Sequence, residues 1–516
     1  MPKALDRRSF LGASAAVAAL AACGGGAVPT AQPAQKPAES KPAEPRPEGT
    51  RPAAAPAATT APTGGGAATA APATKPAAGA AQGTPAAPAG GAATPAAAAT
   101  GTSGQAAAKP AAAPQQIYTM VDKVWSDLGM KAATEAFNKE NPQLGSVTLE
   151  ETAEGWDTKV LQQIRDKSLR WSAHGYAAFF DSYKYIKAGL VAPIDDYLKA
   201  SKFPWGQKQK DVYFTSRIYD ALLLDGKQYY IPMKANVHLV GYRADYLQKA
   251  GYETFPKTWD EVEKMLAKMK PDLDKEQVTA LGVSRDIFRT LGTMFTTFIE
   301  KPFDDQGVLK FESPEWIQLI ELVKKWKDAG HVRIDDNAQH YDVWQKGKFA
   351  FSLGSHSLVR TGRQVWGPEK VKGSPPAQAS ASAPPRTWIH IDSGFVFPNA
   401  PNPQLGTDWL LSVLGPEGNP ADAWWKGVLQ FSGQPVFASM IDKHLKPDKN
   451  ISEVYDVMQL VPNSQIITLP VAGAYAIMQA KIWPHLDRFF NGQGSAKEAM
   501  AGVRKDVDEE LAKQKK

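Results

Sequence analysis

Residues 225–270 read DGKQYYIPMKANVHLVGYRADYLQKAGYETFPKTWDEVEKMLAKMK, and their pattern is the strongest evidence for the architecture of this chain. Two short apolar runs, at 229–232 and 238–242, have the composition of buried strands. The run TWDE at 258–261 is a capping box, which predicts a helix that Pro271 ends. Strands followed by a capped helix indicate an α/β fold.

The same alternation continues on both sides of this segment. Strands are predicted at 118–124, 146–151, 176–180, 349–353 and 388–397, and helices at 128–140, 156–169, 182–188 and from Pro314 to Gly330. Residues 372–386 are rich in Pro, Ser and Ala, which predicts a loop. The segment that begins at Ile117 holds every Trp and Tyr, and its length of about 400 residues is enough for two lobes of ordinary domain size.

The beginning of the chain has the layout of a secretory leader. The pair Arg7-Arg8 precedes an apolar run at 10–20, which ends in Leu-Ala-Ala-Cys. This ending resembles the lipobox of bacterial lipoproteins, so we expect a signal peptide over 1–22 and a lipid anchor on Cys23. Cys23 is the only cysteine, which excludes an intramolecular disulfide.

The pair Arg7-Arg8 also resembles a twin-arginine export signal, although Asp6 and Gly12 depart from the usual pattern. An ordinary arginine pair in a general-secretion signal is the alternative. Both routes predict an extracytoplasmic protein that is lipid-anchored to the cell membrane.

We expect residues 23–116 to be a lipidated cysteine followed by a linker, because the segment is made almost entirely of Ala, Pro, Gly, Thr, Ser and Gln. Because this segment contains no aromatic residue, it cannot nucleate a core, and we expect it to be disordered. The net charge of the chain is +6, and its lysines are dispersed rather than clustered in a stripe. We therefore expect no nucleic-acid partner.

Several segments resemble, in this order, the motifs of one protein family. They are AGLVAPI at 188–194, DGKQYYIP at 225–232, GYRADYL at 241–247, FPKTWDE at 255–261, KGKFAF at 346–351 and the closing helix at 492–500. Together with the lipobox, they resemble the family-1 extracellular solute-binding proteins of ABC transporters, the maltose-binding-protein-like group. Arg243 stands where that family usually has Asn.

The resemblance implies a two-lobe, periplasmic-binding-protein-like (type II) α/β fold with hinge-crossing segments, preceded by a disordered linker. It implies one lobe over 117–235 and 391–440 and the other over 236–390 and 441–516. Such a protein closes by hinge motion over a small polar solute, with a mono- or oligosaccharide favoured. The implied partners are this solute and the transmembrane subunits of an ABC permease, and the implied state is a monomer without cofactor or metal.

The resemblance, together with polar and aromatic residues at predicted strand ends, gives ten candidate ligand-binding residues. They are Trp125, Asp127, Trp156, Phe180, Asp181, Asn236, Ser284, His356, Trp388 and Tyr475. Sugars need aromatic faces for their C–H surfaces, and carboxylates, amides and hydroxyls for their hydroxyl groups. Core packing or helix capping is the alternative role, as for Asp181 at an N-cap. His356 stands where the resemblance implies a stacking Trp, which leaves a polyol phosphate, a polyamine or another small polar solute open.

The sequence contains no catalytic constellation. Adjacent carboxylates at 195–196, 304–305 and 335–336 lie in turn-like contexts rather than across a sugar site. Residues 354–358 do not fit G-x-S-x-G, and the eight histidines show no H-E-x-x-H spacing. We therefore expect a binding protein and not an enzyme. A secreted glycan-processing enzyme and a non-transporting ligand sensor for a receptor kinase remain the alternatives.

Overall fold

The computed structural model describes residues 115–514, apart from 154, 432, 449–450, 461–463 and 468. The predicted signal peptide, the candidate lipidation site Cys23 and all but the end of the predicted linker lie outside the described residues. No helix in the described part combines the length and the apolar composition that crossing a bilayer requires.

Ten strands form one mixed sheet, in the order β2-β1-β3-β11-β6-β9-β7-β8, with β10 added on β6 and β12 on β11. Their bounds are β1 (Gln116–Val121), β2 (Ser146–Glu151), β3 (Trp171–Ala177), β6 (Ile231–Arg243), β7 (Thr279–Ser284), β8 (Val332–Asp335), β9 (Phe349–Ser355), β10 (Val371–Ser374), β11 (Trp388–Val396) and β12 (Gln465–Ile467). A separate hairpin consists of β4 (Leu223–Leu224) and β5 (Lys227–Gln228).

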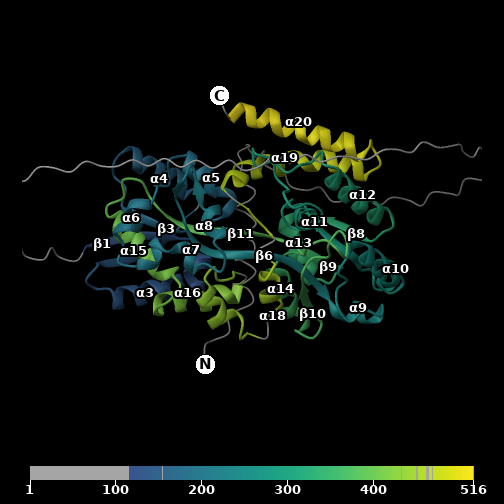
Figure 1. The fold of residues 1–516 in the computed structure, drawn as a ribbon, viewed down its shortest axis with the longest axis horizontal. Coiled ribbons are helices and arrows are strands. Elements are labelled where there is room, and N and C mark those ends of the chain that lie inside the picture. The colour runs from purple at the N-terminus through teal and green to yellow at the C-terminus, as the bar shows by residue number, and fades with distance from the viewer. Residues whose placement is uncertain are drawn as a thin grey trace, which may run out of the picture. The chain divides into compact units, whose positions relative to one another are not determined.

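Helices cover the sheet on both sides (Figure 1). Those before the long strand β6 are α2 (Lys123–Trp125), α3 (Lys131–Glu140), α4 (Trp156–Arg165), α5 (Phe179–Lys187), α6 (Asp195–Ala200), α7 (Gln209–Val212) and α8 (Arg217–Ala221). Those between β6 and β11 are α9 (Ala244–Lys249), α10 (Trp259–Glu276), α11 (Thr290–Phe298), α12 (Pro314–Asp328), α13 (Asn337–Gln345) and α14 (Ser357–Trp366). The last are α15 (Pro403–Val413), α16 (Asn419–Phe431), α17 (Ala438–Met440), α18 (Ser452–Met458), α19 (Leu469–Phe490) and α20 (Ala496–Gln514).

Two central strands, β6 and β11, join the two halves of the sheet. Through residues 231–237, β6 pairs with β11, and through residues 238–242 it pairs with β9. At its other edge, β11 pairs with β3 of the first half. The expected α/β architecture, with two lobes and strands that cross between them, is confirmed.

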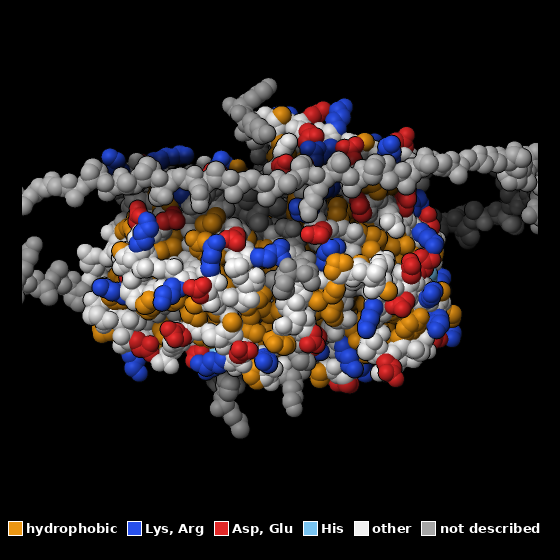
Figure 2. Space-filling view, in the orientation of Figure 1, with side chains coloured by type: hydrophobic (Ala, Val, Ile, Leu, Met, Phe, Trp, Pro, Cys, Tyr) orange, Lys and Arg blue, Asp and Glu red, His pale blue; other side chains and the backbone are white. Residues whose placement is uncertain are grey.

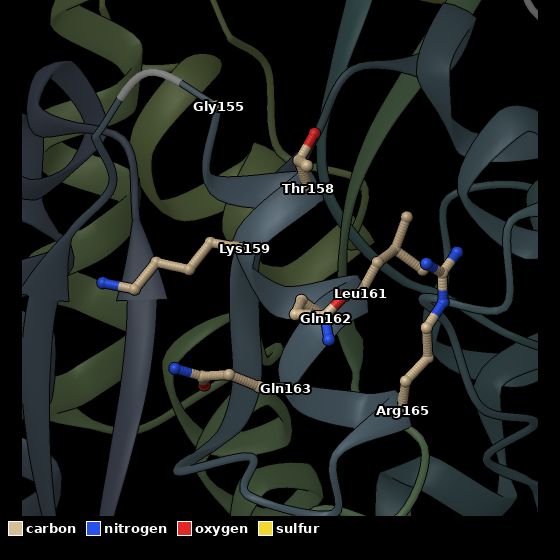
Figure 3. A pocket seen from close by; sticks show the side chains of 7 residues that line it. All are labelled: Gly155, Thr158, Lys159, Leu161, Gln162, Gln163 and Arg165. Carbon is tan, nitrogen blue, oxygen red and sulfur yellow. The ribbon is translucent and has the colours of Figure 1, made fainter.

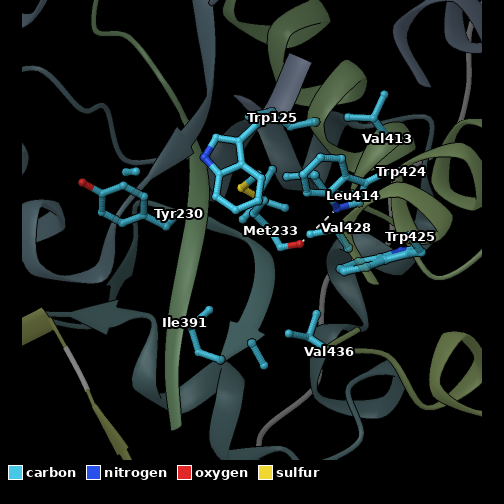
Figure 4. Close-up of a cluster of buried hydrophobic side chains, with 14 of the residues drawn as sticks. Trp125, Tyr230, Met233, Ile391, Val413, Leu414, Trp424, Trp425, Val428 and Val436 are labelled. Atoms are coloured by element: carbon cyan, nitrogen blue, oxygen red, sulfur yellow. Dashed lines mark hydrogen bonds between the residues drawn. The ribbon is translucent and has the colours of Figure 1, made fainter. Parts of the chain in front are cut away.

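Two buried hydrophobic clusters pack against the sheet, and each draws on both of its halves: the first includes Phe349 of β9, and the second includes Phe179 of α5. In the first, α3, α15 and α16 pack near β1 and β3, and Trp125, Met233, Trp424 and Trp425 lie together (Figure 4). The Trp424 indole nitrogen donates to the Met233 carbonyl at 3.1 Å, which satisfies a buried donor. The second cluster includes Trp259 of α10 together with Trp316 and Trp326 of α12.

The chain returns to the first cluster late in the sequence. Ile441, Leu445 and Val454 belong to the same buried cluster as Trp424, whereas Met478 of α19 belongs to the second. Where one lobe ends and the other begins along the chain stays a prediction.

Three local expectations were wrong. The strand expected at 176–180 is only the end of β3 (Trp171–Ala177), and α5 begins at Phe179. The runs at 229–232 and 238–242 are not separate strands, because residues 233–237 continue the ladder and β6 runs unbroken for 13 residues. Helix α10 does not end at Pro271 but continues to Glu276. Pro271 lies on the exposed side of α10, and the following turn is fixed by buried Leu273 and by the Tyr246 hydroxyl, which donates to Glu276 at 2.7 Å.

Candidate functional site

The crossing strands present polar side chains on one face. Side chains two residues apart share a face of a strand. This polar face carries Lys234, Asn236 and His238 of β6 and Trp388, His390 and Asp392 of β11. In the register of the two strands, Asn236 lies opposite His390, and Lys234 lies opposite Asp392. The intervening residues, among them Val237 and Ile391, belong to the first hydrophobic cluster.

Lys234 and Asp392 form a buried ion pair in the middle of this face. Their side chains are 4% and 6% exposed, and the Lys234 ammonium donates to Asp392 Oδ2. Asn236 accepts from Lys234 at 3.1 Å and donates to Asp392 at 3.0 Å. The Phe179 amide, at the start of α5, donates to the other oxygen of Asp392 at 3.0 Å. Such complete pairing offsets the large cost of removing both charges from water.

Three carboxylates surround the end of β3. Asp122 follows β1, Asp181 lies in the first turn of α5, and together with Asp392 they raise the pKa of Tyr176, after burial, which is the largest cause. The carboxyl ends of parallel strands are where α/β proteins commonly place ligand sites. Burial also raises the pKa of Asp181 to about 6; the nearby Lys184 opposes this rise, and neighbouring carboxylates add to it.

A second polar group comes from the other half of the sheet. Arg289 donates to Asp286 at 3.2 Å and to the Tyr341 hydroxyl. Tyr341 is in turn 2.7 Å from the Ser357 hydroxyl, at the start of α14. Arg289, like Lys234, is thus matched with a carboxylate.

Aromatic rings connect the two groups. Phe180 of α5 stacks on Tyr475 of α19, with ring centroids 5.4 Å apart. Tyr475 also stacks on Phe288 at 4.9 Å, and its hydroxyl hydrogen-bonds to Asp286. Phe179 lies 4.4 Å from the His390 ring and 6.1 Å from that of Phe288. Phe179 and Phe180 come from α5, before the crossing strand β6, whereas Phe288 and Tyr475 come from segments after it. All four rings belong to or pack against the second hydrophobic cluster, and Phe179 contacts His390 of the polar face.

The structure brings six of the ten candidate residues into this region. Phe180, Asp181, Asn236 and Tyr475 belong to the groups just described, and Trp388 is fully buried beneath them against Phe288, at 4.8 Å. Trp125 lies behind the ion pair, with the Lys234 ammonium 4.9 Å from its ring.

Four candidates lie elsewhere. Asp127 is exposed and pairs with Lys123 at 3.0 Å, and Trp156 packs on His174 at 4.4 Å. Ser284 is buried at the end of β7 and accepts from the Asp286 amide at 3.2 Å. His356 is 1% exposed, and burial lowers its pKa to about 3, so its ring is part of the interior rather than a stacking surface. Ligand contact stays a prediction for all ten residues.

Sequence reasoning missed Lys234, Arg289, His390 and Asp392. The signal for three of them was the alternation of polar and apolar residues at 233–237 and 388–392, since charged residues are rarely buried unless they are paired. Arg289 precedes an apolar helix and gave no comparable signal.

A pocket of about 620 Å³ lies elsewhere in the first lobe (Figure 3). It is lined by Gly155, Thr158, Lys159, Leu161, Gln162, Gln163 and Arg165. These residues belong to α4 and the residue before it, so the pocket is a depression along one helix and shares no residue with the polar face. Within the described part of the chain, no three His, Cys, Asp or Glu side chains are grouped to hold a metal ion.

Residues 132–450 match the family described as Bacterial extracellular solute-binding protein. Two curated relatives, each named as a binding protein, come from Brucella abortus (strain 2308) and Brucella suis biovar 1 (strain 1330). Each is 28% identical over 143 residues, which cover 26% of this chain and 30% of the relative. The chain therefore spans under a third of the length of these relatives.

Solved structures share the fold over most of the chain. The sugar-binding protein MalE from Xanthomonas citri matches with a TM-score of 0.63 and 18% identity, over 78% of this chain and 98% of that one. The substrate-binding protein Lmo0181 from Listeria monocytogenes, in complex with cycloalternan, matches at 0.57 and 16%, over 77% and 99%. A solute-binding protein from Thermotoga lettingae, bound with α-D-tagatose, matches at 0.58 and 16%, over 76% and 98%.

Proposed function

This chain belongs to the bacterial extracellular solute-binding protein family, and from that membership we propose that it captures a neutral mono- or oligosaccharide between its two lobes. Its fold is the two-lobe, periplasmic-binding-protein-like (type II) fold. A solute that contacts both lobes stabilises the closed arrangement, because only differential binding shifts such an equilibrium.

One observation carries the choice of a sugar. The polar face of β6 and β11 is flanked by the rings of Phe179, Phe180, Phe288 and Tyr475, contributed by α5 and by segments that follow β6 in the chain. A pyranose or furanose presents C–H surfaces to such rings and hydroxyl groups to amides and carboxylates, which combines apolar contact with a few placed polar groups. The structural neighbours from Xanthomonas citri, Listeria monocytogenes and Thermotoga lettingae, described with a sugar or a sugar-like ligand, support the same class.

The charges at the site favour a neutral solute over a phosphorylated one. Lys234 is paired with Asp392, and Arg289 with Asp286, while Asp122 and Asp181 add further acidic groups. A phosphate would compete with two existing ion pairs and meet additional negative charge, which costs free energy in a poorly solvated site. Positive charge is also not gathered elsewhere on the visible face, where basic and acidic side chains are interspersed (Figure 2).

We extend the proposal to the cellular role. The protein would be exported and anchored through a lipid on Cys23. The long linker would join this anchor to the two lobes. It would deliver the closed, loaded form as a monomer to the transmembrane subunits of an ABC permease, without catalysing a reaction. The export route, twin-arginine or general secretion, belongs to the same proposal.

A thermal-shift screen of the full chain tests the proposed function. The panel contains maltose, maltotriose and α-D-tagatose, with glycerol 3-phosphate and spermidine as the charged alternatives. A saccharide at 100 times its dissociation constant should add about 2.7 kcal/mol to the free energy of unfolding. Chromatography after incubation should recover that saccharide unchanged.

Three results would contradict parts of this proposal. A response to glycerol 3-phosphate or spermidine alone would reject the sugar and keep a solute receptor. Consumption of the saccharide would favour the glycan-processing enzyme. If the protein binds the saccharide but deletion of a neighbouring permease gene leaves saccharide uptake unchanged, the result would favour a sensor.

A further inference from the structure

We propose that His390, in the crossing strand β11, is a ligand-contacting hydrogen-bond donor, and that Trp388 and His238 fix its proton on Nε2. The proposal deepens the proposed function by naming one contact of the saccharide site. It rests on two hydrogen bonds that link three rings, those of Trp388, His238 and His390, along the polar face of the crossing strands.

The chain of contacts begins at the buried Trp388. Its indole nitrogen lies 2.9 Å from Nδ1 of His238, and the Thr293 hydroxyl lies 2.8 Å from the same nitrogen. An indole N–H can only donate, so Nδ1 of His238 must be an acceptor without a proton. His238 is 2% exposed, and burial lowers its pKa well below the usual value, so the ring is neutral.

The proton of neutral His238 is therefore on Nε2, which lies 3.2 Å from Nδ1 of His390. His238 Nε2–H donates to His390, whose Nδ1 must then be an acceptor too. A neutral His390 carries its own proton on Nε2. Each ring in the series thus dictates the tautomer of the next, as hydrogen-bonded histidines commonly do.

His390 is kept neutral by its surroundings. Burial lowers its pKa well below the usual value, and the positive charges of Lys234 and Arg289 add to the effect. The groups that face it are the Phe179 ring at 4.4 Å, the neighbouring His238, and Asn236, opposite it in the strand register.

The remaining N–H of His390 is available to a solute. His390 is half-buried, and the hydrogen bond that its ring makes within the described residues is the one at Nδ1. It stands on the crossing strand, beside Phe179 and in the same face as Asn236. A neutral ring fixed in this form offers a donor, which suits the hydroxyl or ring oxygen of a saccharide. Because the proton is fixed before binding, no reorientation is needed when the solute arrives.

Two substitutions at His390 test the contact in the full chain, by calorimetric titration with maltose, maltotriose and α-D-tagatose. His390→Phe keeps a planar ring but removes the donor. It should raise the dissociation constant of the bound saccharide about tenfold. His390→Gln places an amide N–H near the same position and should stay within about threefold of wild type. Equal affinity of His390→Phe and wild type would overturn the proposal and leave the proposed function standing.

The tautomer has a readout that does not depend on any ligand. Long-range ¹H–¹⁵N spectra of the histidine-labelled full chain should show His390 protonated on Nε2 and unprotonated on Nδ1. Trp388→Phe removes the donor that sets the series and should bring a second tautomer of His390 into the spectrum. If His390 of the wild-type protein is protonated on Nδ1, the proposed series of tautomers is wrong. If the wild-type protein binds no saccharide, both the proposed function and the proposed contact are wrong.

Discussion

Asp181 keeps its proton to a higher pH than an ordinary aspartate because burial raises its pKa to about 6. It lies in the first turn of α5, beside the stacked rings of Phe180 and Tyr475. Below pH 6 the carboxyl group can donate to a sugar hydroxyl, and above pH 6 it only accepts. The polar character of the region therefore changes within the range in which many bacteria live.

The raised pKa predicts how stability depends on pH. Between the unfolded value near 4 and the folded value of about 6, the native state binds more protons than the unfolded state, so stability falls as the pH rises through this window. Asp181→Asn removes this loss, and its stability relative to wild type should increase from pH 4 to pH 7. Urea unfolding at pH 4, 5, 6 and 7 measures the difference.

The neighbouring Ser182→Ala is the matched control for this measurement. It removes a hydroxyl that donates to the Ala178 carbonyl and changes no titrating group. Its free energy of unfolding should therefore differ from that of wild type by the same amount from pH 4 to pH 7. A level difference for Asp181→Asn would refute the assignment of a raised pKa to this carboxyl.

The capping box of α10 is the element for which sequence and structure agree most closely. The Thr258 hydroxyl accepts from the Glu261 amide at 3.3 Å, and the Glu261 carboxylate accepts from the Thr258 amide at 3.3 Å. Four backbone amides at a helix start lack partners within the helix, and this exchange satisfies two of them, those of Thr258 and Glu261.

Removing the cap should destabilise the protein by a predictable amount. Thr258→Ala should lower the free energy of unfolding by about 1 kcal/mol, whereas Thr258→Ser keeps the oxygen and should cost only a few tenths. Urea unfolding followed by tryptophan fluorescence compares the three proteins. An equal loss in both variants would mean that the methyl group of Thr258 matters and the cap does not.

The sequence was sufficient for elements whose cause is local. The strand at 146–151 and the helix that begins at Pro314 were predicted correctly, since alternation and capping residues lie within the elements themselves. The break predicted at Pro271 was wrong because packing of the following turn overrides the local cost of a proline. The split of β6 was wrong because Lys234 and Asn236 interrupt its apolar pattern, and their partner Asp392 lies far along the chain.

Residues of the candidate site also divide into those that local sequence indicates and those that depend on distant partners. Phe180, Asp181 and Asn236 are candidates because they follow or enter a predicted strand, where ligand sites are common, and their contact with a ligand stays a prediction. His390 and Asp392 were missed, since a polar residue in a strand is normally solvent-exposed, and only the pairing of β6 with β11 places these two beside their partners His238, Lys234 and Asn236. The sequence of either segment alone does not predict which distant strand it will pair with.

At the scale of the whole molecule, one continuous strand, β6, contributes residues to both hydrophobic clusters. Val237 of β6 belongs to the first cluster and Val240 to the second, with every residue of the strand buried. Unfolding one half would expose half of this strand and break its pairing with the other half. The two clusters should therefore unfold together.

Calorimetry of the full chain should show a single transition. Trp424→Ala in the first cluster and Trp326→Ala in the second should each cost about 3–5 kcal/mol, and each should lower the temperature of that same transition. Trp→Phe at either position retains most of the buried volume and should lower it less. Two resolved transitions, with each alanine variant shifting only one, would show that the lobes unfold independently.

The pairing of β3 with β11 has a consequence for how the protein is made. The edge of β3 is completed when Ser393 pairs with Ala177, and the ribosome adds about 200 residues between these two partners. At 5–20 residues per second, the first lobe has an open sheet edge for roughly 10–40 s. An unpaired edge is a template for association with other chains. The nascent chain must therefore be shielded or kept unfolded until β11 is synthesised, so the two lobes mature almost together despite their order in the sequence.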